Sequence, residues 1–258
     1  QKKLIQILTL CVILLFGYSV FITVEKNKLV NKGRLEIDGG TYIGDLVNGV
    51  RHGEGRFVDS SGTIYKGNWV NDLKHGKGRF VGTKKSEIYG YEKFIYNGYW
   101  KDDLEHGKGT YTWEDLGIKM NPLDYKSRGK YEGEWKEGKF HGQGIMKFES
   151  GSSYEGGFKD GKTHGKGTFK GSDGSSYVGG YKAGYRHGQG ASKGADGDSY
   201  EGGYKDGLVY GQGIYTRADK TVLIPIEGKG KFEKGKMVGS FTETKPDGTT
   251  RTVKDPKF

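Results

Sequence analysis

Bulky and small residues alternate along most of this chain, in a phrase that recurs seven times. Each copy opens with a tyrosine, has glycine two residues later and a bulky residue two residues after that. The opening tyrosines are Tyr42, Tyr65, Tyr96, Tyr131, Tyr154, Tyr177 and Tyr200. Because the side chains of a strand point alternately to its two faces, this period of two predicts a β-strand with the bulky residues on one face.

The second half of each copy carries a G-x-G motif, which most copies follow with another bulky residue. The first copy shows it as Gly53, Gly55 and Phe57, and the turn-forming pair Asn48-Gly49 separates the two halves. Each copy therefore predicts a hairpin. We expect an all-β fold in which consecutive hairpins join into one elongated, single-layer antiparallel sheet.

The glycines leave room for a large ring to lie across the bare backbone of a neighbouring strand. One hairpin cannot bury its aromatics alone, so stability should grow as hairpins stack. The opposite face carries polar residues such as Lys66, Glu132 and Glu155, and it should face water. A sheet of this kind predicts a long exposed aromatic groove, which would mark a partner site unless the inserts, the C-terminal tail or another protein covers it. The predicted partner-binding residues are Tyr65, Trp69, Tyr96, Trp100, Tyr131, Trp135, Tyr154, Phe158, Tyr177, Tyr181, Tyr200 and Tyr204.

An uncharged run from Leu4 to Val24 precedes the repeated region. At 1.5 Å per residue a helix of this length matches the roughly 30 Å core of a bilayer. A cleaved signal peptide would have a shorter apolar core, and a buried helix would find little to pack on in a polar, β-like chain. We expect a transmembrane helix, with an orientation that the lysines on both sides leave open. Because the chain begins with Gln1 rather than Met, we also expect residues upstream of it.

The copies are spaced by 23, 31, 35, 23, 23 and 23 residues, so the two longer spacings predict inserts. A degenerate eighth copy is expected over residues 228–241. The predicted organisation is a transmembrane helix at 1–25, a linker at 26–40, seven repeats at 41–215 with inserts at 81–95 and 112–130, and the eighth copy and tail at 216–258.

The phrase YEGEWKEGKFHGQG, which begins at Tyr131, resembles the MORN repeat (membrane occupation and recognition nexus), whose signature is YxGxWxxGxxHGxG. The resemblance covers roughly residues 41–215. It is weaker in the first copy, which has Leu46 in place of tryptophan, and in the seventh, which has Tyr210 in place of histidine. The resemblance implies a binding module that contacts acidic phospholipids or bridges two membranes. In some such proteins the repeats precede a kinase or methyltransferase domain, but too few residues follow the seventh copy here for either.

Composition and charge add limited information. Glycine makes up 48 of 258 residues without a period of three, which excludes collagen, and an aromatic content of 13% is high for a disordered chain. The formal net charge of +10 is spread among acidic residues, without the basic block of a nucleic-acid-binding arm. The single cysteine, Cys11, excludes an intramolecular disulfide.

Six histidines occupy one repeat position and invite a metal hypothesis: His52, His75, His106, His141, His164 and His187. Equivalent positions in successive hairpins lie about 10 Å apart, whereas zinc ligands lie about 2 Å from the ion, so we expect no shared metal site. No G-x-G motif leads into an amphipathic helix, and no nucleophile has a positioned base. We therefore expect neither a cofactor nor an enzyme activity.

Three functions remain open from the sequence. The first is a single-pass membrane scaffold or accessory subunit that binds partner proteins of a membrane complex through the aromatic face, with the mitochondrial inner membrane as an expected location. The second is a tether that binds acidic phospholipids. The third is a secreted protein with a cleaved signal. None of them involves nucleic acid.

Overall fold

The computed structural model describes residues 30–37, 39–86, 90–115, 128–218, 225–233, 236–244 and 248–254. The predicted transmembrane helix over residues 1–25 lies outside these ranges. Within them, no helix has the length and apolar character that a membrane crossing requires.

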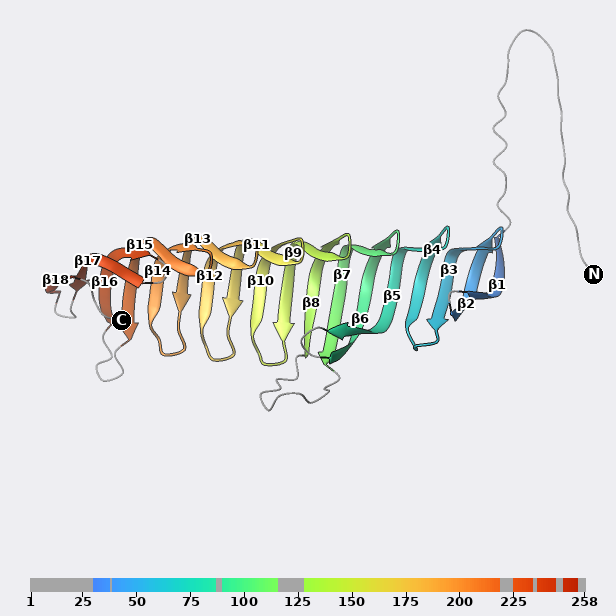
Figure 1. The fold of residues 1–258 in the computed structure, drawn as a ribbon, viewed down its shortest axis with the longest axis horizontal. Helices are drawn as coiled ribbons and strands as arrows, with labels where there is room; N and C mark the ends of the chain where they lie inside the picture. The colour runs from blue at the N-terminus through green and yellow to red at the C-terminus, as the bar shows by residue number, and fades with distance from the viewer. Residues whose placement is uncertain are drawn as a thin grey trace, which may run out of the picture.

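The described residues form one antiparallel sheet of eighteen strands (Figure 1). The strands are β1 Val30–Ile37, β2 Gly40–Val47, β3 Val50–Asp59, β4 Ile64–Val70, β5 Leu73–Ser86, β6 Gly90–Lys101, β7 Leu104–Asp115, β8 Arg128–Lys136, β9 Lys139–Phe148, β10 Ser153–Lys159, β11 Lys162–Lys170, β12 Ser176–Lys182, β13 Tyr185–Lys193, β14 Ser199–Lys205, β15 Leu208–Ala218, β16 Pro225–Glu233, β17 Lys236–Thr244 and β18 Thr250–Lys254. Each strand pairs with the next along the chain, so β1 and β18 are the two ends of an open, elongated ribbon. This confirms the predicted all-β fold and its single antiparallel sheet.

Tight turns join the two strands of each repeat, as the sequence predicted. Asn48 and Gly49 have φ values of 54° and 80°, and Asp160 and Gly161 have values of 51° and 82°. Positive φ at both central residues is the requirement of a type I′ turn, whose twist matches that of the flanking strands. The Asn-Gly and Asp-Gly pairs therefore fix where each hairpin reverses.

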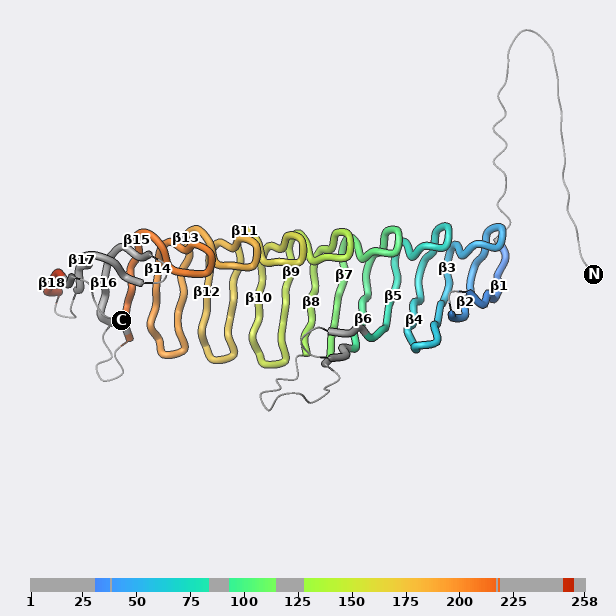
Figure 2. Tube along the Cα trace, viewed as in Figure 1, coloured from blue at the N-terminus to red at the C-terminus, as the bar shows by residue number. Residues whose placement is uncertain are grey.

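Each hairpin also contains a bulge, which the periodicity of the sequence did not predict. In β8 and β9 the pairing passes from Gly133↔Gly144 directly to Glu134↔His141, which leaves Gly142 and Gln143 as extra residues on β9. Gly142 has a φ of 57°, a left-handed conformation that glycine adopts without steric cost. A bulge bends the strand that carries it, and the tips of the hairpins fold over along one margin of the ribbon (Figure 2).

The predicted organisation differs from the structure at two places. Residues 30–37 of the predicted linker form β1, which pairs with β2 from Val30↔Val47 to Ile37↔Gly40. The first insert is largely a continuation of the ladder, because β5 and β6 stay paired as far as Ser86↔Gly90. Over the range expected to hold an eighth copy, β16 and β17 form a hairpin. Alternation continues through these segments, and strands extend wherever a neighbour offers unpaired backbone groups.

Candidate functional site

The tyrosine that opens each repeat lies flat across a pair of glycines on adjacent strands. Gly133 of β8 faces Gly144 of β9, and a Cβ built on Gly144 would lie 2.5 Å from the Cε2 and Oη atoms of Tyr131. The same geometry recurs at Gly55, where a Cβ would lie 2.3 Å from the ring of Tyr42. The glycines therefore form the floor on which each ring rests, as the sequence suggested.

Successive rings contact one another edge to face. Tyr65 meets Trp69 of its own repeat at 5.0 Å between ring centroids and Trp100 of the next repeat at 5.4 Å. Aromatic pairs in this orientation contribute about 0.5–1.5 kcal/mol beyond their buried area. The pattern continues without a break from Tyr42 to Tyr200. We call this series the aromatic ladder; it comprises Tyr42, Tyr65, Trp69, Tyr96, Trp100, Tyr131, Trp135, Tyr154, Phe158, Tyr177, Tyr181, Tyr200 and Tyr204.

The expectation that these rings line an exposed groove is wrong. All twelve predicted partner-binding residues belong to the aromatic ladder, and all of them are buried except Tyr181, which is half-buried. Tyr96, Tyr131 and Tyr177 are 0% exposed. The chain itself covers them, because the bulge folds each hairpin tip over the rings. Phe140, near the start of β9, stacks on Tyr131 with centroids 4.0 Å apart.

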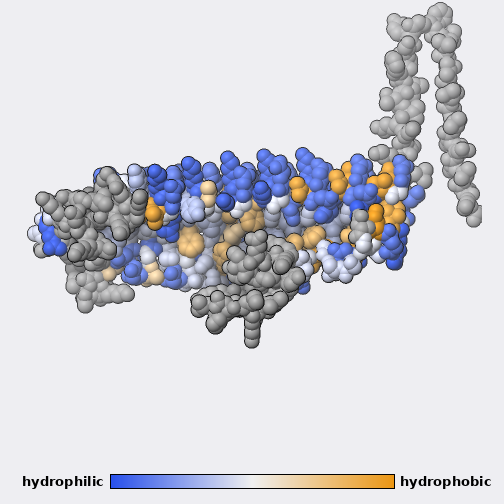
Figure 3. All heavy atoms as spheres, in the orientation of Figure 1, coloured by the Kyte–Doolittle hydropathy of each residue, from blue (hydrophilic) through white to orange (hydrophobic). Residues whose placement is uncertain are grey.

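The accessible aromatic surface consists instead of half-buried residues that pack against the aromatic ladder. They include Phe57, Phe80 and Phe169, which follow the G-x-G motif, and Phe94, Trp113 and Phe140. Apolar residues gather along the middle of one face, below a hydrophilic margin (Figure 3). The sequence did signal the members that follow G-x-G, as the second bulky residue of each repeat, but it could not show that they stay more accessible than the opening tyrosines.

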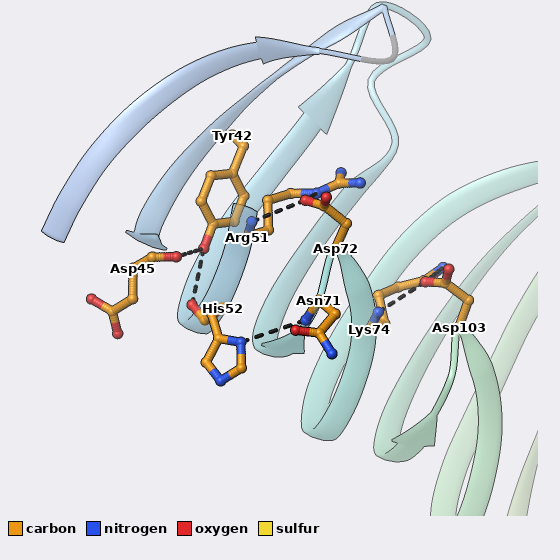
Figure 4. Close-up of polar contacts among 8 residues, drawn as sticks. All are labelled: Tyr42, Asp45, Arg51, His52, Asn71, Asp72, Lys74 and Asp103. Atoms are coloured by element: carbon orange, nitrogen blue, oxygen red, sulfur yellow. Dashed lines mark hydrogen bonds and ion pairs between the residues drawn. The ribbon is translucent and has the colours of Figure 1, made fainter. Parts of the chain in front are cut away.

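Each ladder tyrosine also satisfies the backbone at the bulge. The hydroxyl of Tyr42 donates to the Asp45 carbonyl at 2.8 Å (Figure 4), and that of Tyr154 donates to the Gly157 carbonyl at 3.0 Å. The same bond, to the carbonyl three residues later, recurs in Tyr65, Tyr96, Tyr131, Tyr177 and Tyr200. A buried carbonyl that loses its donor costs more than the bond contributes, so the hydroxyl explains why tyrosine, rather than phenylalanine, opens each repeat.

Replacing Tyr154 with phenylalanine should lower the free energy of unfolding by about 1–3 kcal/mol, because the ring remains while the donor to the Gly157 carbonyl is lost. Urea unfolding of the full chain in mild detergent, followed by near-UV circular dichroism, measures this change. Tyr185→Phe is the matched control, since Tyr185 is 60% exposed. Equal unfolding midpoints for the two variants would contradict the role assigned to the hydroxyl.

Burial also shifts the titration of the ladder tyrosines. Desolvation raises the pKa of Tyr42, Tyr154, Tyr177 and Tyr200 from 10.0 to about 12, and raises that of Tyr131 further. The folded state therefore favours the neutral phenol over the phenolate more strongly than the unfolded state does.

We expect the protein to lose stability under alkaline conditions. The stabilisation from neutral ladder tyrosines is fully present below the unfolded pKa of about 10 and is lost as the pH rises through the folded values near 12. Thermal unfolding recorded at increasing pH, together with tyrosinate absorbance, measures this effect. Exposed tyrosines such as Tyr185 should titrate first, without unfolding. A single titration of all tyrosines near 10 in the folded protein would contradict the prediction.

Side chains at the hairpin tips tie each repeat to the next (Figure 4). Asp72 accepts hydrogen bonds from the backbone N–H and the Nε of Arg51, at 2.9 and 3.0 Å. Asp103 accepts the backbone N–H of Lys74 at 2.9 Å, and the Lys74 ammonium lies 3.7 Å from its carboxylate. Arg51 is 8% exposed. Such contacts fix the angle between successive hairpin tips and hold them over the aromatic ladder.

The histidines lie beside the turn of the following repeat. The backbone N–H of Asn71 donates to Nδ1 of His52 at 3.5 Å, and Nδ1 of His75 lies 3.5 Å from a carboxylate oxygen of Asp102. The expected position near a turn is thus observed, with the difference that the turn belongs to the next hairpin. Among the described residues, no three potential ligands gather where one metal ion could reach them.

The face opposite the aromatic ladder carries a row of basic side chains over β1–β5. The strand registers align Arg34, Ile43, Arg56, Lys66 and Arg79 across five neighbouring strands, and all five side chains are exposed. We call its four cations, Arg34, Arg56, Lys66 and Arg79, the basic row. A shallow hollow of about 800 Å³ lies over it, lined also by Lys32 and Lys77, with Glu54 as its acidic member.

The same row changes sign farther along the sheet. Its exposed members there include Glu132 on β8, Glu155 on β10 and Glu201 on β14. The sequence analysis noted these acidic residues as a water-facing surface, and their exposure confirms that expectation. The dispersed charge along the sequence thus separates in space into a basic end and a more acidic middle.

A comparison with protein-family models matches the MORN repeat seven times, at residues 42–64, 65–86, 96–117, 131–153, 154–176, 177–199 and 200–222. Every match begins at the opening tyrosine of a repeat, and together the matches cover more than half of the chain. No curated protein matches the sequence.

Proposed function

The chain belongs to the MORN-repeat proteins, and from that premise we propose that it is a non-catalytic, membrane-anchored scaffold that binds partner proteins of a membrane complex. The observation that carries the proposal is the continuous aromatic ladder with half-buried rings beside it. Fixed rings in a rigid sheet bind a partner at a low entropic cost, because little of their freedom remains to be lost.

The contact surface differs from the one that the sequence suggested. A partner would touch half-buried residues such as Phe57, Phe80, Phe169 and Tyr181, while the buried ladder holds them in place. Aromatic side chains are enriched at interfaces, since they bring a large contact area with few rotatable bonds.

Co-purification of the full chain in mild detergent tests this proposal. We expect defined partners in fixed stoichiometry, and we expect Phe169→Ser to lose them. Val178→Ser is the matched control, because Val178 is 55% exposed and lies on the opposite face. Near-UV circular dichroism checks that both variants remain folded. Retention of the partners by Phe169→Ser and by the equivalent Phe57→Ser would count against binding through this face.

The membrane anchor rests on the apolar run from Leu4 to Val24. We propose that it spans a membrane, with the mitochondrial inner membrane as the suggested location. The full chain should stay with the membrane fraction in alkaline carbonate, whereas a chain that lacks residues 1–28 should be released. Mass spectrometry of the amino terminus distinguishes this from a cleaved signal, because a cleaved chain would lack the run.

A second candidate function, a tether for acidic phospholipids, is supported by the basic row. Its four cations lie next to one another on the sheet end that follows the apolar run in sequence. Each basic residue near an anionic membrane surface contributes about 1 kcal/mol. Changing all four to glutamate should abolish salt-sensitive binding to phosphatidylserine vesicles by the chain that lacks residues 1–28. Binding that is insensitive to both salt and this change would rule out the basic row.

A further inference from the structure

A hollow of about 300 Å³ lies on the aromatic face between the third and fourth repeats. Its aromatic walls are Phe94 of β6, Tyr111 of β7, Trp135 of β8 and Phe140 of β9. Trp135 lies 5.9 Å from Tyr111 and 4.7 Å from Phe140 between ring centroids. Glu105 and Lys139 also line the hollow, together with Gly138 and Gly161.

The repeats before this point show what normally lies over such rings. The guanidinium carbon of Arg51 lies 4.6 Å from the centroid of Trp69, and the ammonium of Lys74 lies 4.7 Å from that of Trp100. Arg51 is paired with Asp72, and Lys74 with Asp103. In both repeats the chain therefore supplies its own cation to the tryptophan and a carboxylate to hold that cation (Figure 4).

Glu105 is the structural equivalent of Arg51 and Lys74. The carbonyls of these residues accept the backbone N–H of the second turn residue in the next hairpin, at 3.0 Å in each case: Asp72 to Arg51, Asp103 to Lys74 and Gly138 to Glu105. The three positions therefore superimpose by their backbone contacts, although neither the residue type nor the charge is kept.

At this third step both members of the pair have changed. A carboxylate replaces the cation beside Trp135, and glycine replaces the aspartate of the turn. A Cβ on Gly138 would lie 3.4 Å from Oε2 of Glu105, so the carboxylate occupies the side of the turn where Asp72 and Asp103 have their own side chains. Aromatic walls together with a carboxylate are the features that recognise a cation in a partly desolvated site.

We propose that this hollow binds an arginine or lysine side chain of a partner protein, which takes the place that Arg51 and Lys74 fill in the preceding repeats. The inference deepens the proposed scaffold function and rests on it: it names the chemistry of one anchor residue in the partner. The guanidinium or ammonium group stacks on Trp135 and forms an ion pair with Glu105, while its aliphatic stem lies along Phe140 and Tyr111.

Fluorine NMR of the full chain tests the proposal directly. The protein, in a detergent without choline, carries 5-fluorotryptophan at its 4 tryptophans, which single Trp→Phe variants assign. On titration with N-acetylarginine methylamide at constant ionic strength, the Trp135 signal should shift, whereas those of Trp69 and Trp100 should not. The neutral citrulline analogue should leave Trp135 unchanged. A Trp135 signal that is insensitive to arginine and lysine amides, or equally sensitive to citrulline, overturns the proposal.

Two variants make the test specific. Glu105→Gln should weaken arginine binding by up to about fivefold, the range of a partly exposed ion pair. The double change Glu105→Lys with Gly138→Asp rebuilds the pair seen at Lys74 and Asp103, so it should abolish binding while the fold is kept. Unchanged binding in this double variant would contradict the assigned site.

Two further controls exclude other occupants. Lys139 is exposed and lines the hollow, so Lys139→Ala should retain or strengthen binding; loss of binding would instead show that the chain's own lysine forms the site. Choline should shift Trp135 less than arginine does, and the reverse order would replace the protein side chain by a quaternary ammonium ligand. Partner co-purification is read separately. If partners persist when arginine does not bind, only this inference fails, and if no partner exists, the scaffold function fails.

Discussion

Replacing Gly144 with alanine should lower the free energy of unfolding by about 3 kcal/mol, at the upper end of the cost of overpacking. The new methyl group would lie 2.5 Å from two atoms of the Tyr131 ring, which is 0% exposed and has no room to move away. Phe140 stacks on that ring at 4.0 Å, and Phe158 meets its edge at 5.1 Å. Alanine would otherwise stabilise a strand by about 0.5–1 kcal/mol relative to glycine, so the sign of the result decides whether the ring is fixed.

Gly161→Ala is the control for this change. Gly161 has a φ of 82°, and no atom lies within 4 Å of a Cβ built there, so only the cost of the left-handed backbone, about 1 kcal/mol, is expected. Urea unfolding monitored by tryptophan fluorescence compares the two variants. Limited proteolysis should locate new cleavage of Gly144→Ala in β8 and β9. An unfolding midpoint for Gly144→Ala at or above that of Gly161→Ala would show that the ring does not rest on the glycine floor.

Replacing Tyr131 with alanine should cost about 3–5 kcal/mol, the range for truncation of a large buried aromatic residue. The change removes the edge-to-face contacts with Trp135 at 5.5 Å and with Phe158 at 5.1 Å. It also removes the hydroxyl that donates to the Glu134 carbonyl at 2.9 Å. Because repeats are coupled through nearest neighbours, the loss should divide the array into two parts that unfold separately.

Calorimetry of the full chain measures this loss of coupling. The unmodified protein should show one main transition for the repeats, and Tyr131→Ala should show two. Tyr185→Ala serves as the control, because that side chain is 60% exposed and should change the transition little. A single transition in Tyr131→Ala with an unchanged midpoint would indicate that backbone pairing, rather than the aromatic ladder, couples the repeats.

The bent hairpin separates the two jobs of the aromatic residues. The opening tyrosines and the bulky residues four positions later are buried and hold the repeats together. The rings that follow G-x-G, such as Phe57 and Phe169, keep part of their surface accessible. A scaffold built in this way can change its accessible residues, as Ser192 illustrates. Ser192 replaces a ring in the sixth repeat and accepts a hydrogen bond from Tyr204 at 2.8 Å.

The hairpins and their order could be predicted from the sequence alone. The alternation that starts at Tyr131, and turn pairs such as Asp160-Gly161, are local signals: the period of two defines a strand, and positive φ at both turn residues defines its reversal. Pairing of consecutive hairpins follows as well, because no single hairpin can bury its rings. The polar face of Glu132 and Glu155 was predictable for the same reason of alternation.

Which rings stay accessible was decided only by the tertiary structure. The bulge at Gly142 and Gln143 depends on how β9 pairs with β8, and it brings Phe140 back over Tyr131. A pattern of alternation assumes a straight strand and therefore cannot show this fold-back. The basic row and the hollow at Trp135 likewise join side chains from separate repeats, through strand registers that no local stretch of sequence contains. The sequence determined the repeating hairpin, and the pairing between strands determined what its surface presents.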